Sequence, residues 1–309
     1  MIITRNLKNI RASTLDLHIH SNASVDGQFS PRELVKQVAK YGVHTVAVSD
    51  HDTVRNVLEM MKYANQSSIE VIPAGEFSCD WKKYDIHVLG YGIQIQDKRF
   101  EQLKQELEER MCESSKKMVE AVKAMGIVLQ EEKIWKQAVH GVIAPERIGE
   151  SALELQQNRN HPVLQPFFPG GERSDNPVLN FAWDICERGG PAYIPVQHNT
   201  PDKVVDLIHD TGGVAILAHP GCCFGKDISV AVEFLEEFQV DGIEVYSSYH
   251  EEETMAVYRK LAEERNMLVT SGSDFHGKTK PNLTPGCVSC ENRENEILER
   301  LKMAIKKRK

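Results

Sequence analysis

The feature that most constrains the fold is an alternation of short apolar runs with amphipathic helical segments. Thr45 to Ser49 and Val214 to Ala218 are β-branched and apolar, which is typical of buried parallel strands. Capped helical segments follow runs of this kind; one begins at Ser30, where Pro31 and Glu33 complete a capping box. Strand and helix alternating at this spacing indicate βαβ units, so we predict an α/β fold.

The alternation stops near the middle of the chain. From Asp97 to Met125 the sequence is helical and highly charged, and helical segments separated by Pro and Gly continue to about Tyr193. We expect residues 98–199 to form a helical insertion that lies over the site and recognises the substrate. The catalytic α/β domain would then consist of a first part at 1–97 and a second part at 200–309.

Composition narrows the class of protein and its compartment. The 309 residues carry a net charge of -8, which argues against a general binder of duplex nucleic acid or other polyanions. No run approaches a transmembrane helix, and the polar start from Met1 to Thr14 lacks the apolar core of a signal peptide. Seven cysteines without a framework spacing fit a reducing environment. We therefore expect a cytoplasmic protein that does not bind membranes.

Polar side chains gather where the predicted strands end. His18 and His20 project from one face of the first strand because alternate residues of a strand face the same side. In a β/α barrel the carboxyl ends of the strands share one face, so the side chains there converge. His87 lies within its predicted strand. The residues at or just past strand ends are His18, His20, Asp26, Asp50, His51, Glu76, His219, Glu244, Asp274 and His276.

The types of side chain in this group favour metal chemistry. Carboxylates gathered at this face of a barrel would repel one another unless cations balanced their charge. Imidazole and carboxylate donors without cysteine favour divalent ions such as Mn, Fe or Zn. Without Asp50 and Glu244, which we expect to support the ligands, nine candidate ligands remain. They are too many for one ion and fit two or three, an arrangement that serves phosphoryl transfer. Hydrolysis of a phosphate ester is therefore the leading prediction.

Seven motifs, in order, carry a family resemblance. The strings DLHIHS, SDHDTV, PAGEFS, IHVLGYGI, GGVAILAHPG, DGIEVY and SGSDFHG resemble the PHP (polymerase and histidinol phosphatase) family, and in particular its small stand-alone phosphoesterases that act on nucleotides or RNA ends. The resemblance covers about residues 15–91 and 214–276. It implies a distorted (β/α)7 barrel and a centre of two or three metal ions.

The resemblance also implies a role for individual residues. Glu76, His219 and Asp274 would be the catalytic residues. Asp50, Asp52 and Glu244 would hold the metal-binding side chains in place without binding metal themselves. One departure affects the third set, because Val25 stands between Ser24 and Asp26 where related sequences have no residue, which lengthens the turn. The implied ligand sets are His18 and His20 with Asp274 and bridging Glu76; His87 and His219 with the same Glu76; and Asp26 with His51 and His276.

The predicted mechanism is in-line attack on phosphorus by a hydroxide that bridges the metals. The substrate would be a small phosphate ester such as a nucleotide, a nucleoside bisphosphate or a short RNA. Arg147, near a predicted helix start, and Lys278 or Lys280, after the last motif, are candidates to bind a second phosphate.

Other functions stay open from the sequence. A phosphodiesterase acting on a small cyclic sugar phosphate is the second reading, and the lengthened Asp26 turn keeps it open. Histidinol-phosphate phosphatase fits the motifs less well, and the DHDT and SDFH strings favour phosphorus chemistry over carbon–nitrogen hydrolysis. A catalytically silent PHP binding module belongs to a different class, and the intact ligand at every motif argues against it.

Overall fold

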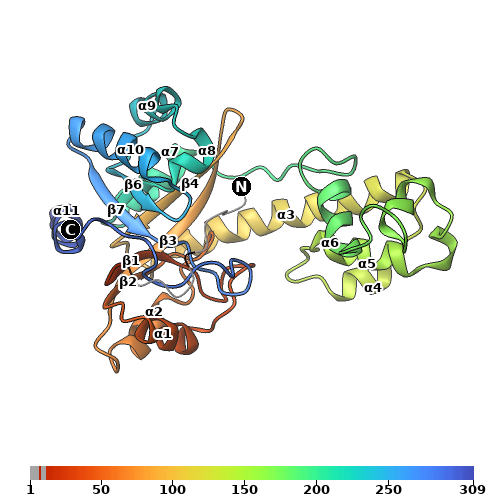
Figure 1. The fold of residues 1–309 in the computed structure, drawn as a ribbon, viewed down its shortest axis with the longest axis horizontal. Helices are drawn as coiled ribbons and strands as arrows, with labels where there is room; N and C mark the ends of the chain where they lie inside the picture. Colours follow the sequence, from red (N-terminus) through yellow and green to blue (C-terminus); the bar gives the residue numbers. More distant parts are fainter. Residues whose placement is uncertain (1–6, 8–11) are drawn as a thin grey trace. The chain divides into compact units, whose positions relative to one another are not determined.

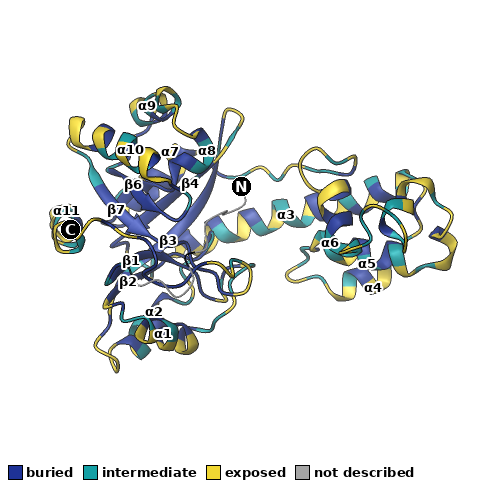
Figure 2. Ribbon diagram, in the orientation of Figure 1, coloured by how far each residue is buried: buried dark blue, intermediate teal, exposed yellow. Residues whose placement is uncertain are grey.

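The computed structural model describes residue 7 and residues 12–309, so most of the polar start from Met1 to Thr14 lies outside the described residues. Seven strands form one nearly closed sheet (Figure 1). Buried apolar side chains of this sheet and its helices make the principal core, visible as dark strands in Figure 2. The strands are β1 (Leu15–Ile19), β2 (Thr45–Val48), β3 (Glu70–Trp81), β4 (Tyr84–Tyr91), β5 (Val214–Leu217), β6 (Gly242–Ser247) and β7 (Leu268–Gly272).

The strands lie side by side in chain order, from β1 to β7. β1, β2 and β3 are parallel, as are β5, β6 and β7. A parallel bridge between Ile19 and Phe275 connects the first strand to the segment that follows the last, which closes the ring. The predicted α/β fold with a distorted seven-stranded barrel is confirmed.

β4 departs from the βαβ pattern that the sequence suggested. It is antiparallel to both β3 and β5, and a two-residue turn at Lys82 and Lys83 joins it to β3 without a helix. Lys82 has a φ of +54°, the left-handed conformation that tight hairpin turns use. The expected place of Glu76 at or just past a strand end is also wrong, because β3 continues to Trp81 as the first arm of this hairpin and Glu76 lies within it.

Helices fill the other connections of the barrel. The predicted helix after Ser30 begins with Pro31, and the Glu33 carboxylate accepts a hydrogen bond from the Ser30 backbone N–H at 3.0 Å. Most of these helices are exposed on one side and pack a buried side toward the strands (Figure 2). They are α1 (Pro31–Lys40), α2 (Val57–Ala64), α7 (Pro201–Asp210), α8 (Pro220–Phe224), α9 (Ile228–Glu237), α10 (Glu252–Glu264) and α11 (Glu294–Arg308).

The chain divides into two compact units. The barrel unit comprises residues up to 103 together with 198–309, and the second unit comprises 104–197. The second unit has a separate hydrophobic core, to which Val122, Ile148 and Phe181 contribute. Its helical elements are the larger part of α3 (Lys98–Ala124), then α4 (Glu131–Lys136), α5 (Pro145–Glu154), two 3-10 segments (Gln156–Asn158 and Pro162–Phe167), α6 (Pro177–Phe181) and a π-helical turn (Ala182–Cys186).

Within the part of the chain that the structure describes, no helix combines the length and the apolar composition needed to cross a bilayer.

Candidate metal centre

Four side chains meet at one buried point of the barrel unit. His18 on β1 and His20 just after it bring their Nε2 atoms toward Glu76 of β3 and Asp274, which follows β7. One ligand atom from each of the four lies within 4.8 Å of the others. Asp274 Oδ1 lies 3.1 Å from His20 Nε2 and 3.5 Å from His18 Nε2. We call these four residues the first donor set.

Glu76 faces two groups of histidines with its two carboxylate oxygens. Its Oε2 lies 3.2 Å from His18 Nε2 and 3.3 Å from His20 Nε2. Its Oε1 lies 2.9 Å from His87 Nδ1 and 3.0 Å from His219 Nε2. A carboxylate directed both ways can bridge two ions, so we call Glu76, His87 and His219 the second donor set.

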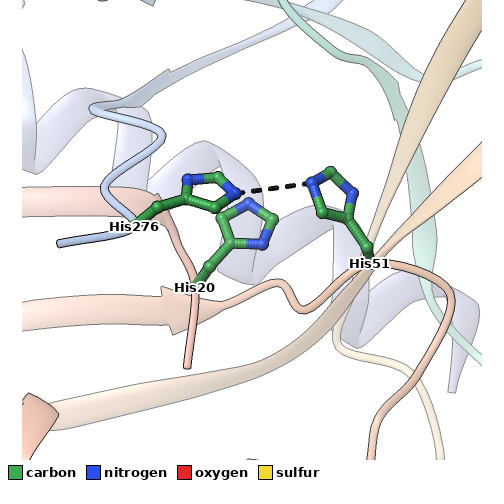
Figure 3. Close-up of side chains that lie close together, drawn as sticks. All are labelled: His20, His51 and His276. Carbon is green, nitrogen blue, oxygen red and sulfur yellow. Dashed lines mark hydrogen bonds between the residues drawn. The ribbon is translucent and has the colours of Figure 1, made fainter. Parts of the chain in front are cut away.

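Asp26, His51 and His276 form a third donor set. His276 Nε2 lies 3.2 Å from Asp26 Oδ2 and 3.4 Å from His51 Nε2. Figure 3 shows the His51 and His276 rings facing each other beside His20, whose ring stacks on that of His276 with centroids 3.9 Å apart. The extra residue Val25 is 95% exposed, so the longer turn places Val25 in solvent while Asp26 still reaches His276.

The buried polar atoms of the first donor set test whether metal ions fit the site. Among the described residues, no hydrogen-bond partner is found for His18 Nε2, His20 Nε2, Glu76 Oε2 or Asp274 Oδ1. Burying four polar atoms without hydrogen bonds at one point costs free energy unless a ligand binds to them. The donors are nitrogen and oxygen, and none of the seven cysteines, all of them described, belongs to a candidate metal group. The donor sets therefore fit borderline or hard divalent ions.

In three of the histidines, a hydrogen bond at Nδ1 determines that Nε2 is the ring nitrogen that faces the centre. His18 Nδ1 donates to Glu244 Oε1 at 2.9 Å, and His276 Nδ1 donates to the Asp274 carbonyl at 2.9 Å. His20 Nδ1 lies 2.9 Å from Ser24 Oγ, whose hydroxyl proton is donated to Asp50. In all three rings the Nδ1 proton is taken up by this contact, which leaves the Nε2 lone pair directed at the centre.

The charges of the site are strongly coupled. Burial alone would raise the pKa of Glu76, but the nearby His18, His87 and His51 hold it well below the usual range. Burial also opposes the charge on His18, yet Glu76, Glu244 and Asp274 together raise its pKa well above the ordinary value. Glu76 is therefore ionised, and without metal ions His18 carries a second proton, which an ion bound at its Nε2 would displace.

Of the predicted supporting residues, Asp50 acts on a ligand indirectly and Asp52 departs from the prediction. Asp50 reaches His20 only through Ser24. Asp52 does not orient a histidine ring in the predicted way: its oxygens accept from the Ser78 N–H and hydroxyl, both at 2.9 Å, and so hold β3. Glu244 does support ligands, since it binds the His18 ring and accepts from the His219 N–H at 2.9 Å.

Sequence reasoning missed a buried carboxylate that ties the first strand to the last motif. Asp16 accepts hydrogen bonds from the N–H of Ser273 at 2.9 Å and of Gly286 at 2.8 Å, which fixes the segment that carries Asp274. Burial raises the pKa of Asp16 to about 6 despite these bonds. Its place at the start of the DLHIHS string, two residues before His18 and so in phase with the alternating pair of ligands, was an available signal.

Backbone geometry explains how ligands from different strands reach one point. His219 and Asp274 follow β5 and β7 with φ values of +26° and +56°, sparsely populated conformations that aim side chains inward. His87 lies near the amino-terminal end of β4, not at a carboxyl end. Because β4 runs opposite to β3 and β5, its beginning lies at the face where theirs end, which brings His87 to Glu76.

The predicted substrate-binding residues lie in different parts of the molecule. Arg147 is on α5 in the second unit, where its guanidinium donates to Glu150 at 2.6 Å. Lys278 has an exposed side chain, and its backbone N–H donates to Gln28 Oε1 at 2.7 Å. Lys280 is the residue of this group that contacts the first donor set, through Asp274.

Comparisons with known proteins find a family match over part of the chain and several similar proteins. Residues 16–123 match the model of the family described as the PHP domain. The chain is 28% identical to the 5'-3' exoribonuclease Rnm of Escherichia coli over 84% of each chain. It is 26% identical to the 3',5'-nucleoside bisphosphate phosphatase of Chromobacterium violaceum, covering 85% of this chain and 87% of the relative.

A solved structure supports the fold. The chain resembles a protein from Chromobacterium violaceum described as an amidohydrolase, with a TM-score of 0.70 and 22% identity. The match covers 93% of this chain and 97% of that one. At this identity the likeness concerns the fold, and it extends over both units.

Proposed function

We propose that this chain, a member of the PHP-domain family, is a metal-dependent hydrolase that cleaves the phosphate ester of a nucleotide, a nucleoside bisphosphate or the end of a short RNA. Two sequence relatives support this substrate class, since one is named an exoribonuclease and the other a nucleoside bisphosphate phosphatase. The three donor sets would hold two or three divalent ions, of Mn, Fe or Zn.

The observation that carries the proposal is the double orientation of Glu76. One oxygen faces His18 and His20, whereas the other faces His87 and His219. Hydrolases that cleave phosphate esters with paired ions hold the two ions close enough to act on one phosphoryl group, and a carboxylate directed both ways is suited to do this. A single structural ion would not require donors on both sides of Glu76.

The residues of the chain have defined tasks in this reaction. Glu76, His219 and Asp274 would hold the ions, which when bound would supply the Lewis acidity that activates water and neutralises phosphoryl charge. Glu244 holds the His18 ring and the backbone of His219 in place at the same time. The buried walls around these residues exclude bulk water and thereby strengthen every charge interaction at the centre.

Metal content measured by elemental analysis tests the first half of the proposal. The wild-type protein and the variants His18→Ala and Glu76→Gln would be compared with His44→Ala, because His44 is an exposed histidine outside the donor sets. We expect two or more ions in the wild type and in His44→Ala, and clear loss in the other two variants. Thermal unfolding would show whether each variant is folded.

Phosphate release from matched esters tests the second half. The substrates are a nucleoside 3',5'-bisphosphate, a 5'-phosphorylated RNA oligonucleotide, a sugar phosphate and a small cyclic phosphate. Preferred cleavage of the first two supports the proposal, whereas preference for the cyclic ester would replace it with the phosphodiesterase reading. Protein that stays metal-free and inactive after Mn or Zn is added would overturn the enzyme and indicate a binding module.

A further inference from the structure

One lysine lies beside the first donor set without belonging to it. Lys280 is four residues beyond His276, and its ammonium contacts Asp274 Oδ2 and lies 2.8 Å from the Tyr249 hydroxyl. Its side chain is 20% exposed, so the cation is enclosed but still reachable from solvent. The Tyr249 ring stands edge-on to His219, with centroids 5.3 Å apart, which places it next to the second donor set as well.

Asp274 connects this cation to the metal centre. Its Oδ2 faces Lys280 and Tyr249, whereas its Oδ1 faces the Nε2 atoms of His18 and His20. The ammonium is therefore separated from the first donor set by one carboxylate group. A phosphoryl group held at that centre would be within the reach of a lysine side chain.

The hydrogen bonds around Lys280 leave it donor capacity. The Tyr249 hydroxyl donates to Asp274 Oδ2 at 2.8 Å, so its oxygen accepts from the ammonium. An ammonium has three N–H donors, and among the described residues two acceptors are found for them, Asp274 and Tyr249. These two contacts fix the ammonium in position and leave its third N–H available to an anion.

We propose that the Lys280 ammonium, held by Tyr249 and Asp274, binds a phosphoryl oxygen of the substrate. The inference rests on the proposed function and adds a substrate-binding residue to that site. A charge-assisted hydrogen bond is stronger than a neutral one, and a cation already in place loses little entropy when the phosphate arrives. Tyr249 is a positioning residue that acts through Lys280.

Lys278 provides the matched control because it belongs to the same turn and carries the same charge. Its side chain is exposed, and the contact that holds this residue is made by its backbone N–H with Gln28. Replacing Lys278 removes one positive charge near the centre without removing a fixed donor. A difference between the two lysines therefore separates direct binding from a general electrostatic effect.

The experiment measures the affinity of metal-loaded protein for inorganic phosphate by calorimetry, together with KM and metal content. Lys280→Met should weaken phosphate binding by about ten- to hundredfold and raise KM, with metal content unchanged. Lys280→Arg should restore part of the affinity, Tyr249→Phe should cause a smaller loss, and Lys278→Met should stay within about twofold of wild type.

Two results would overturn the inference. One is unchanged phosphate affinity in Lys280→Met; the other is loss of metal from this variant with full recovery of phosphate affinity when metal is added, which would mean that Lys280 only supports Asp274. Phosphate binding needs no turnover, so this comparison can be read even if no ester is cleaved. Absence of hydrolysis by the wild type would instead contradict the proposed function.

Discussion

The first and third donor sets use the same kinds of side chain but are held in different ways. His18, His20, Glu76 and Asp274 lie on strands or directly after them, and their side chains are at most 3% exposed. In the third set Asp26 sits on a turn and its side chain is 37% exposed, while that of His51 is 25% exposed. We infer that the sheet builds a rigid site and the turn a weaker one, because loops deform more easily than strands.

The largest effect is expected from the residue that joins the first two sets. Glu76→Gln removes the charge and one of the two oxygens that face the histidines, so it should abolish binding of both ions. Activity should fall by well over a hundredfold, since replacing a residue that only hydrogen-bonds to a metal ligand already lowers metal affinity or activity by about ten- to hundredfold. Metal analysis and turnover measure the loss.

A control for this substitution is available on the same strand. Glu70 begins β3, is exposed and pairs with Lys302 at 2.6 Å, so Glu70→Gln should leave metal content and activity close to wild type. Full metal occupancy in Glu76→Gln would contradict the bridging role.

A smaller effect is expected in the third set. Asp26→Asn removes a charge that faces His276, so it should reduce metal content by one ion and activity by about ten- to hundredfold. The ions of the first two sets should remain, because Asp26 pairs with His276, which belongs to neither of those sets. Loss of all ions in this variant would show that the sets are not independent and would contradict a separate, weaker third site.

Metal affinity should depend on pH through His51. Burial by itself would lower the pKa of this ring, but Glu76 and Asp26 raise it to about 9 in the metal-free protein. The ring is therefore protonated at pH 7 and must lose its proton to bind an ion, so affinity should rise with pH up to about 9, by roughly tenfold per unit for each displaced proton.

Calorimetry in buffers of different ionisation enthalpy would count the protons released. In His51→Gln the released number should be lower and the rise with pH shallower. Equal proton release by the variant and the wild type would show that another group supplies the proton.

The smallest effect is expected from a hydrogen bond that holds the turn. The Thr279 hydroxyl donates to the Asp26 carbonyl at 2.5 Å. Thr279→Val keeps the shape of the side chain and removes this bond, which should weaken binding of the third ion by about two- to tenfold. Metal titration should show the first two ions unaffected. A third ion bound as tightly as in wild type would mean that other contacts already fix the turn.

Much of this molecule could be predicted from its sequence because the signals are local. The alternation of β-branched runs and helices predicted the α/β barrel, and the positions of polar residues at or after those runs pointed to the donor residues apart from His87, which lies within its strand. Their grouping into three sets came from the family resemblance. The period of two in β1 placed His18 and His20 on one side, as found. Such patterns depend on a few neighbouring residues, which a single sequence displays directly.

The direction of β4, the length of β3 and the choice between two lysines were decided by tertiary structure. Strand direction depends in part on pairing between distant segments: Val88 of β4 pairs with Leu217 of β5, on the other side of the second unit in the sequence, and composition alone did not reveal this antiparallel pair. In the sequence, Lys278 and Lys280 are two lysines of the same turn, and nothing in their neighbours distinguishes them. Only the packing of Tyr249 and Asp274 against one of them places a cation beside the donor sets, because contacts between distant segments set the position of a flexible side chain.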